Sequence, residues 1–427
     1  MRETLPLEKQ LAQGAMDETL LRFYGADHLE TAKKRCREVL CGFAKTFEGQ
    51  PEALFSAPGR TELGGNHTDH QHGRVLAASI DLDILAAAAP NQSGMIRVQS
   101  QGYPLIVVEL RELTPRPKEQ NTSAALIRGV AARLAALGCP LENAGLDAFI
   151  TSDVPGGSGL SSSAAFEVLI GTMLNELFFG GKSSAVEIAQ IGQYAENVFF
   201  GKPCGLMDQT ASSVGGVVAI DFADTAAPVV EKIDLDLSAY GHALCILDSG
   251  AGHADLTAEY AAITDELKAV CGHFGKEVLR EVPESAFLAA LPQIRKLAGD
   301  RAVLRAMHFY AENERAAQQA LALKMGDFNG FLDLVRQSGQ SSALYLQNVV
   351  PTGQTARQEL MLTLALCERV LNGRGAARVH GGGFGGTAQA FVPLDLLEEF
   401  RTRTEAVLGK GHCHVLSIRP VGGARLA

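Results

Sequence analysis

A glycine- and serine-rich segment at residues 155–165 is the part of the sequence best suited to bind phosphate. It lies between a predicted strand, Leu146–Ser152, and an apolar segment with helical spacing, Phe166–Leu177. Glycine lets backbone amides close around an anion, and the following helix adds unpaired N–H groups and the positive end of its dipole. A serine hydroxyl at the helix start could also coordinate Mg²⁺ that bridges two phosphates. The alternative is a flexible loop capped by serines. The G-x-x-x-x-G-K-[ST] pattern is absent from the sequence, and the serine density fits a Rossmann turn poorly.

The segment Ala57–His70 combines a guanidinium, an amide, imidazoles and a carboxylate. Each sugar hydroxyl both donates and accepts hydrogen bonds, so a pair such as His67 and Asp69 could read its position. His67, Asp69, His70 and His72 are also possible metal ligands, but close packing in a glycine-rich loop disfavours convergence of all four on one ion. A purely structural loop is the remaining alternative.

Two acidic residues, Glu196 and Asp208, could supply the remaining chemistry of phosphoryl transfer. Glu196 falls late in an apolar helical segment, and Asp208 lies in a turn-like stretch that begins the next element. One carboxylate could hold Mg²⁺ while the other accepts a proton. Taken alone, each could be an ordinary solvated residue.

The elements predicted around these segments mix helices and strands in both halves of the chain. The first 50 residues are expected to be mostly helical, and Leu54–Ser56 is expected to be a short strand that enters a loop over Ala57–Gly73. Ser184-Ala185-Val186-Glu187 is a capping-box pattern that starts a helix running past Glu196. The second half is predicted to contain long helices near 257–270, 303–323 and 355–372. Later in the chain, Gly381–Gly386 contains five glycines around one phenylalanine, which demands close backbone approach to another segment or to a ligand.

The composition indicates a globular protein of more than one domain. The chain has 427 residues, of which 46% are hydrophobic and 20% charged, and this length exceeds one compact core. The mixture of helices and strands in both halves predicts two α+β domains. A change of composition at 222–238 indicates the border between them, which gives domains at 1–222 and 223–427. The formal charge of −10 argues against non-specific nucleic-acid binding.

Cysteine usage and hydropathy predict a cytoplasmic protein with no membrane partner. Eight cysteines lack any C-x-x-C pair, which is typical of free thiols in a reducing compartment. The N-terminus lacks the apolar core of a signal peptide, and no apolar run approaches the ~20 residues that cross a bilayer. We further predict a monomer.

In order and spacing, these segments resemble the motifs of the GHMP small-molecule kinases and, among them, of the galactokinases. Ala57–His70 is similar to the galactokinase signature loop, and Gly156–Ala165 to the family's phosphate loop. Glu196–Gln209 is similar to the stretch with the Mg²⁺ ligand and the catalytic aspartate, and Gly381–Gly386 to the late glycine motif. The resemblance covers nearly the whole chain. It implies an N-terminal ribosomal-protein-S5-like domain and a C-terminal ferredoxin-like domain, with the active site between them.

The resemblance also implies a reaction and a role for individual residues. ATP with Mg²⁺ would phosphorylate the anomeric hydroxyl of a monosaccharide, first of all D-galactose to galactose 1-phosphate. Asp208 would be the catalytic base, and Arg60 would keep it ionised. Mg²⁺ would be held by Glu196 and by Ser163, with Ser162 as the alternative serine. The sugar would be contacted by Asn66, His67, Asp69, Gly205 and Tyr260. The ATP phosphates would be bound by Gly156, Gly157, Ser158, Gly159, Leu160, Ser161 and Ser162.

Four positions depart from the galactokinase pattern. Asn66 replaces a usual glutamate that reads a sugar hydroxyl, His70 a usual tyrosine, Glu62 a usual asparagine and Thr387 a usual cysteine. These departures leave open a kinase for another sugar, such as arabinose, galacturonate or N-acetylgalactosamine. If the native sugar is not galactose, Asn66→Glu is expected to shift preference toward galactose.

Two alternatives of other classes are also open. One is a non-catalytic sugar- and ATP-binding regulator, which would be expected to have lost a phosphate-loop serine, Glu196 or Asp208. The other is a metal hydrolase that uses the histidine-rich loop.

Overall fold

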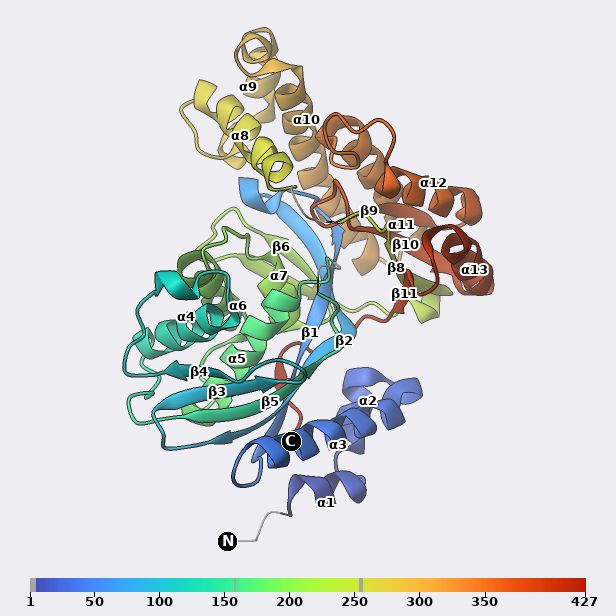
Figure 1. Cartoon of the computed structure of the whole chain (residues 1–427). Coiled ribbons are helices and arrows are strands. Elements are labelled where there is room, and N and C mark those ends of the chain that lie inside the picture. Colours follow the sequence, from blue (N-terminus) through green and yellow to red (C-terminus); the bar gives the residue numbers. More distant parts are fainter. Residues whose placement is uncertain (1–4, 157–158, 253–255) are drawn as a thin grey trace.

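Two mixed α+β domains, each built on one β-sheet, make up the molecule (Figure 1). The structure is a computed structural model and describes residues 5–156, 159–252 and 256–427. The domains share one apolar core cluster, which extends from the first sheet to Phe331 and Phe391 of the second domain. The two domains therefore pack directly on each other.

The first sheet has eight strands in the order β12-β1-β2-β5-β3-β4, with β6 and β7 attached beside β2. Its strands are β1 (Ala53–Gly64), β2 (Arg74–Pro90), β3 (Met95–Ser100), β4 (Ile106–Glu109), β5 (Leu146–Ser152), β6 (Val217–Asp221), β7 (Val229–Ile233) and β12 (Ala424–Arg425). The long strand β2 pairs with β1 along one side, and with β6 and then β5 along the other. The β1–β2 register shifts between Pro58 and Arg60 and again between Glu62 and Gly64. Such bulges bend a strand and re-aim its side chains, and these two flank Arg60.

Helices cover both faces of the first sheet (Figure 1). The helices on one face are α4 (Ser123–Ala136), α5 (Ser162–Phe178), α6 (Ala185–Tyr194) and α7 (Met207–Val214). The helices on the other face are α1 (Leu7–Ala12), α2 (Asp17–Tyr24) and α3 (Leu29–Thr46). The predicted capping box is present at the start of α6, where the Ser184 hydroxyl accepts from the Glu187 amide and the Glu187 side chain accepts from the Ser184 amide.

The N-terminal helices are joined to the sheet by an ionic cluster around the buried Asp83. Arg35 of α3 places Nη1 2.7 Å from Oδ1 of Asp83 in β2, and Nε 2.9 Å from Oδ2 of Asp153. Arg419, from the end of the chain, reaches the other oxygen of Asp83 at 2.9 Å. Asp153 lies two residues before the glycine- and serine-rich segment. The helix α3 is therefore bonded to the chain close to the point where that segment begins.

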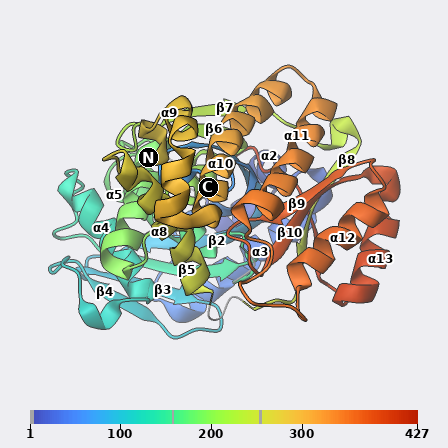
Figure 2. The same ribbon diagram turned by 90° about the horizontal axis from the view of Figure 1, so that it is seen from above.

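The second sheet is antiparallel, in the order β11-β8-β10-β9. Its strands are β8 (His242–Asp248), β9 (Ala376–His380), β10 (Thr387–Pro393) and β11 (Cys413–Leu416). The helices of this domain are α8 (Thr257–His273), α9 (Glu284–Ala289), α10 (Leu291–Lys324), α11 (Phe328–Ser341), α12 (Glu359–Leu371) and α13 (Leu397–Leu408). Figure 2 shows α12 and α13 on one face of this sheet and α11 on the other. Alternate residues of β8 follow this division, because Leu244 and Ile246 join the core shared with the first domain whereas Cys245 and Leu247 pack under α12 and α13.

The strand β7 lies beyond the domain border that was predicted after residue 222, but it belongs to the first sheet. β7 pairs with β6 and so continues the first sheet, which places that border inside a β-hairpin. We propose that the first domain extends through Ile233. The chain end also returns to the first sheet as β12.

Several elements extend further than the sequence pattern predicted. The predicted short strand at Leu54–Ser56 continues to Gly64 as β1, so half of the expected Ala57–Gly73 loop is strand. The reason is that β2 pairs with β1 along almost this whole length. The helix predicted at 303–323 begins at Leu291, with a kink at Gly299. The helices α9, α11 and α13 and the strand β9 were not predicted.

Candidate functional site

Arg60 and Asp208 form a bidentate ion pair at the junction of β1 and α7. Nε of Arg60 lies 2.6 Å from Oδ1 of Asp208, and Nη2 lies 2.7 Å from Oδ2. Asp208 occupies the first turn of α7, where the helix dipole favours a negative charge. The Arg60 side chain is 8% exposed and that of Asp208 is 31% exposed. The arginine is thus fixed inside the protein while the carboxylate remains accessible to a ligand.

Ser161 also bonds to this ion pair. Its Oγ donates to Oδ2 of Asp208 at 2.6 Å. The residue has φ +59°, in the left-handed region that a serine rarely adopts, and it directly precedes α5. Strain of this kind concentrates at functional sites. The Ser161 hydroxyl thus bonds to the carboxylate of Asp208, and the phosphate contact that the sequence assigned to Ser161 stays a prediction.

Opposing effects act on the pKa of Asp208. Burial would raise this pKa, but the Arg60 charge, the Arg60 hydrogen bonds and the Ser161 hydrogen bond together lower it below the usual value for aspartate. Asp208 is therefore ionised at neutral pH. About four lone-pair sites exist on a carboxylate. Arg60 and Ser161 use three of them, which leaves one on Oδ1 for a substrate hydroxyl.

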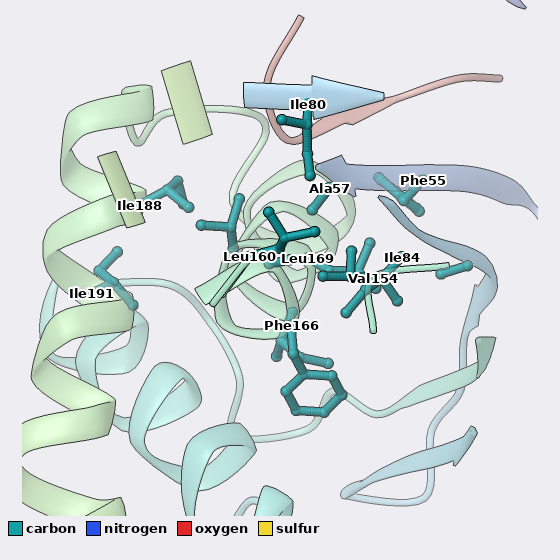
Figure 3. Close-up of a cluster of buried hydrophobic side chains, with 14 of the residues drawn as sticks. Phe55, Ala57, Ile80, Ile84, Val154, Leu160, Phe166, Leu169, Ile188 and Ile191 are labelled. Atoms are coloured by element: carbon teal, nitrogen blue, oxygen red, sulfur yellow. The ribbon is translucent and has the colours of Figure 1, made fainter. Parts of the chain in front are cut away.

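The glycine- and serine-rich segment docks on Arg60 through its backbone. The Arg60 amide donates to the Leu160 carbonyl at 3.0 Å, and Nη1 of Arg60 donates to the Gly159 carbonyl. The Leu160 side chain is fully buried among apolar residues such as Ile80 and Val154 (Figure 3). Leu160 therefore offers a ligand only its main chain and anchors the segment to the core.

The other predicted phosphate contacts lie around the start of α5. Gly159 has φ +73°, and Ser162 and Ser163 form the first turn of the helix, where N–H groups lack intrahelical partners. A Cβ added at Gly156 would meet no atom within 4 Å, so this glycine has open space beside it. Gly157 and Ser158, also predicted to bind phosphate, lie outside the described residues.

Glu196 belongs to a π-helical turn, Ala195–Phe200, that follows α6. π-turns shift the register of a helix and are frequent at functional sites. Oε1 of Glu196 lies 3.5 Å from Oγ of Ser163 and 3.5 Å from Nζ of Lys202. Oε2 accepts from Nε2 of Gln209 at 2.9 Å, and the same nitrogen donates to Glu167 at 2.9 Å. The structure thus brings Ser163 and Glu196 together, as the sequence predicted, and adds Glu167 and Gln209, to which the sequence analysis assigned no role.

Asp69 and Gly205 contact each other near the Arg60–Asp208 pair. A Cβ at Gly205 would lie 2.0 Å from Oδ2 of Asp69, so only glycine allows this contact. The Asp69 side chain is 13% exposed. Burial lowers the pKa of Arg60, but the charge of Asp208 and, more weakly, that of Asp69 raise it. The Asp69 carboxylate is therefore close enough to Arg60 to affect its charge. The predicted sugar contacts Asp69 and Gly205 thus lie beside the Arg60–Asp208 pair.

His67 and Tyr260 both bond to the late glycine motif. Nε2 of His67 lies 2.9 Å from the Gly382 carbonyl, and the Tyr260 hydroxyl donates to the Gly383 carbonyl at 3.0 Å. A Cβ at Gly382 would lie 2.6 Å from the Tyr260 ring. The close approach that this motif was predicted to make is therefore to other segments of the chain.

The protonation of His67 follows from its environment. Burial lowers its pKa to about 4, so the ring is neutral at pH 7. A carbonyl only accepts hydrogen bonds, so Nε2 of His67 carries the proton and Nδ1 is an acceptor. His67 can therefore receive a hydrogen bond from a hydroxyl through Nδ1.

Asn66, another predicted sugar contact, is fully buried. Its Nδ2 donates to the Gly381 carbonyl at 2.7 Å and to Oε1 of Glu62 at 3.1 Å, and its Oδ1 accepts from Nδ2 of Asn348 at 2.9 Å and Oγ of Ser342 at 3.2 Å. The side chain would have to leave these partners to reach a ligand. A direct role of Asn66 in sugar binding stays a prediction.

Three further observations bear on the sequence predictions. All eight cysteines are free. Among the described residues, no group of three or more His, Cys, Asp and Glu side chains is placed to hold a metal ion. Over the same residues, no helix has the length and apolarity needed to cross a membrane.

Family models match two parts of the chain that contribute to this site. The model of the GHMP kinases N terminal domain matches residues 125–216. The model of the galactokinase galactose-binding signature matches residues 42–90. These ranges include the glycine- and serine-rich segment, Asp208 and the loop with His67 and Asp69.

Individual relatives match nearly the whole chain. Galactokinase from Streptomyces coelicolor is 30% identical over 388 residues, which are 90% of this chain and 96% of the relative. The crystal structure of Lactococcus lactis galactokinase complexed with galactose matches with a TM-score of 0.76 and 26% identity, over 91% of this chain and 99% of that chain. Mevalonate kinase from Methanococcus jannaschii shares the fold at 15% identity, with a TM-score of 0.60 over 87% of this chain and 99% of that chain.

The two sheets and their helices thus have the two-domain architecture of the GHMP kinases, which confirms the predicted fold class. Within this class, the chain belongs to the galactokinase family. It is accordingly a sugar kinase that uses ATP.

Proposed function

We propose that this protein transfers the γ-phosphoryl group of Mg²⁺-bound ATP to the anomeric hydroxyl of D-galactose and forms galactose 1-phosphate. The observation that carries the proposal is the ionised Asp208, held by Arg60 and Ser161 at the end of the glycine- and serine-rich segment. The galactokinase relatives and the match to the galactose-binding signature support galactose as the acceptor.

In this proposal, Asp208 orients the acceptor hydroxyl and takes its proton. A carboxylate with a lowered pKa is a weak base, but phosphoryl transfer has a loose transition state that needs little early proton removal. An anomeric hydroxyl is also more acidic than an ordinary alcohol. Arg60 keeps Asp208 ionised and stabilises negative charge near the reacting oxygen.

The residues at the start of α5 would bind the nucleotide. The free N–H groups of this helix and the amides around Gly159 suit the negatively charged phosphates. Ser163 and Glu196 fit Mg²⁺, because both offer the oxygen ligands that this ion prefers and they meet within 3.5 Å beside the helix start. When bound there, the ion would neutralise charge on the phosphates.

His67, Asp69, Gly205 and Tyr260 would surround the sugar, with Asn66 as a further contact. Nδ1 of His67 and the Asp69 carboxylate are acceptors, so they would receive hydrogen bonds from sugar hydroxyls. We place the protein in the cytoplasm as a monomer.

A panel of sugars with coupled detection of ADP tests this proposal. The panel contains galactose, arabinose, galacturonate and N-acetylgalactosamine, and kcat/KM is measured for each. The proposal predicts the highest kcat/KM for galactose. A higher value for another sugar would replace galactose as the substrate, and tight sugar binding without any ADP release would indicate a regulator instead of a kinase.

A further inference from the structure

The short loop Gly65–Thr68 between β1 and β2 carries His67, one of the proposed sugar contacts, and leads directly to Asp69. Two of its residues have left-handed backbone conformations, Gly65 with φ +85° and His67 with φ +59°. The backbone N–H and C=O groups of such an irregular segment are not paired within a strand or helix, so they need other partners where they are buried. The amides of Gly65 and Asn66 and the carbonyl of Asn66 find them in α10 of the second domain, whereas the Gly65 carbonyl accepts from the amide and hydroxyl of Thr68 within the loop.

Glu312 of α10 accepts the two consecutive amides of the loop on one oxygen. Its Oε1 lies 3.1 Å from the Gly65 nitrogen and 3.4 Å from the Asn66 nitrogen. The same oxygen accepts from Oγ of Ser338 at 2.6 Å, and Arg315 pairs with Oε2. Glu312 is fully buried. Burial would raise its pKa, but electrostatic interaction with His308, Arg315 and Arg378 and the Ser338 hydrogen bond lower it to about 2, so the carboxylate keeps its charge.

His308, one turn earlier on α10, holds the carbonyl side of the same residue. Its Nε2 lies 2.9 Å from the Asn66 oxygen, and its Nδ1 lies 2.9 Å from Oγ of Ser341. Burial lowers the pKa of His308, and a carbonyl can only accept, so the proton is on Nε2 and points to Asn66. The amide and the carbonyl of Asn66 are therefore both held by α10.

The position of the His67 ring is coupled to these hydrogen bonds through the backbone of Asn66. His67 directly follows Asn66, and its left-handed conformation directs the ring toward the Gly382 carbonyl. Neither Glu312 nor His308 has a hydrogen bond or ion pair with His67 or Asp69 among the contacts of the described residues. Displacements near 1 Å are enough to weaken a positioned contact strongly.

We infer that Glu312 and His308 are positioning residues of the sugar site, which act from the second domain through the main chain of Gly65 and Asn66 and determine sugar affinity without affecting ATP affinity. The inference rests on the proposed function, because it takes His67 and Asp69 as sugar contacts. The loop amides, Ser338 and Arg315 give the Glu312 carboxylate its partners in a fully buried position, where an unpaired charge would be costly.

Isothermal titration calorimetry on Glu312→Gln, Glu312→Ala and His308→Asn tests the inference, with galactose and a non-hydrolysable ATP analogue titrated separately. The dissociation constant for galactose is expected to rise by about 10-fold to 100-fold in Glu312→Ala. A smaller rise is expected in Glu312→Gln, which keeps an acceptor oxygen. The dissociation constant for the nucleotide is expected to stay within about twofold of wild type in all three.

The matched control is Glu266→Gln. Glu266 of α8 also pairs with arginines of α10, since its oxygens lie 2.5 Å from Arg301 and 2.9 Å from Arg305. Among the described residues, no hydrogen bond or ion pair joins it to the loop. This variant is expected to lose stability and to keep wild-type affinity for both ligands. If Glu266→Gln weakens galactose binding as much as Glu312→Gln does, or if the Glu312 variants weaken both ligands equally, general destabilisation replaces positioning as the explanation.

A ligand-independent measurement separates this inference from the choice of sugar. In protein labelled with ¹⁵N-histidine, the ring signals of His67 are assigned with a His67→Gln variant and compared between wild type and Glu312→Gln. A changed His67 signal with native thermal unfolding supports positioning, and an unchanged signal overturns it. If wild type binds no galactose, the proposed substrate fails, and the same titrations with the sugar that the panel identifies still test the positioning role.

Discussion

The guanidinium of Arg60 holds both carboxylate oxygens of Asp208, at 2.6 and 2.7 Å, although the two residues are 148 positions apart in the sequence. Arg60 comes from a strand between two bulges and Asp208 from the first turn of a helix. This pairing keeps a half-buried aspartate ionised beside the start of α5. The proposed mechanism depends on it.

Replacement of Asp208 by asparagine tests the proposed base. The amide keeps the size of the side chain but cannot take a proton, so kcat is expected to fall by about 10²-fold to 10⁴-fold. Folding and ATP binding are expected to persist, because the proposed nucleotide contacts lie in the glycine- and serine-rich segment and at the start of α5. Steady-state kinetics and calorimetry with an ATP analogue measure both effects. Turnover close to wild type would remove Asp208 from this role.

The Ser161 hydroxyl is expected to influence the pH dependence of the reaction. Asp208 acts only when ionised, and the Ser161 hydrogen bond helps to lower its pKa. Loss of this bond raises that pKa, so the acid limb of kcat/KM should move to higher pH, by about one unit for one charge-assisted hydrogen bond. Activity at pH 7 and above should change less than activity at pH 5.

Two substitutions at 161 distinguish the loss of the hydroxyl from an effect on the left-handed backbone. Ser161→Ala removes the hydroxyl but keeps a Cβ at φ +59°, whereas Ser161→Gly removes the hydroxyl and tolerates that conformation. Both variants should show the same shift of the acid limb if the hydrogen bond is responsible. An acid limb that stays in place in both would exclude this role of Ser161.

Gly205 is predicted to be indispensable for sugar binding. In Gly205→Ala the new Cβ would lie 2.0 Å from the Asp69 carboxylate and force it aside. The KM for the sugar should rise by on the order of 10-fold to 100-fold, and the KM for ATP should change little. Gly272→Ala, in α8, is the control because its Cβ would meet no atom within 4 Å. Equal sugar KM values in the two variants would contradict the placement of Asp69.

The structure changes what we expect of Asn66→Glu. The sequence suggested a shift toward galactose, but residue 66 is fully buried and donates to Glu62 at 3.1 Å. The substitution removes the Nδ2 donor that bonds to Glu62 and to the Gly381 carbonyl, and it places a second carboxylate beside the charges of Glu62 and Glu312. We therefore expect a loss of stability above about 3 kcal/mol. Denaturant unfolding measures this loss, and the sugar panel measures any change of preference.

Exchange of residues 62 and 66 tests whether the stability lost in Asn66→Glu can be recovered. The double variant Glu62→Asn with Asn66→Glu again places one carboxylate and one amide in the pair, so it should recover part of the lost stability. No recovery would show that the Glu62–Asn66 contact is not what the single variant disrupts. A sugar profile unchanged in both variants would count against Asn66 as a selector.

The main elements and the site segments could be predicted from the sequence because they depend on local patterns. The capping box at Ser184 and the helix after the glycine- and serine-rich segment are such patterns, and both are present in the structure. The motif resemblance also predicts Arg60 as the neighbour of Asp208, and the two side chains are paired in the structure.

The remaining features depend on contacts between distant residues, which no local pattern encodes. Asn66 is buried because Asn348, His308 and Glu312 surround it, at least 242 positions further along the chain. The Ser161 hydroxyl reaches Asp208 because a turn forces a left-handed conformation on serine, and serine has no particular preference for it. The extension of β1 to Gly64 likewise results from its pairing with β2.

Identification of the phosphorylated product tests the central claim most directly. The purified protein is incubated with ATP, Mg²⁺ and galactose, and the product is analysed by two-dimensional ¹H–³¹P NMR, with Asp208→Asn as the control. We predict a single phosphate coupled to the anomeric proton for wild type, and at most a trace of it for the variant. A phosphate on any other carbon, no product at all, or equal amounts of product from both proteins would contradict the account.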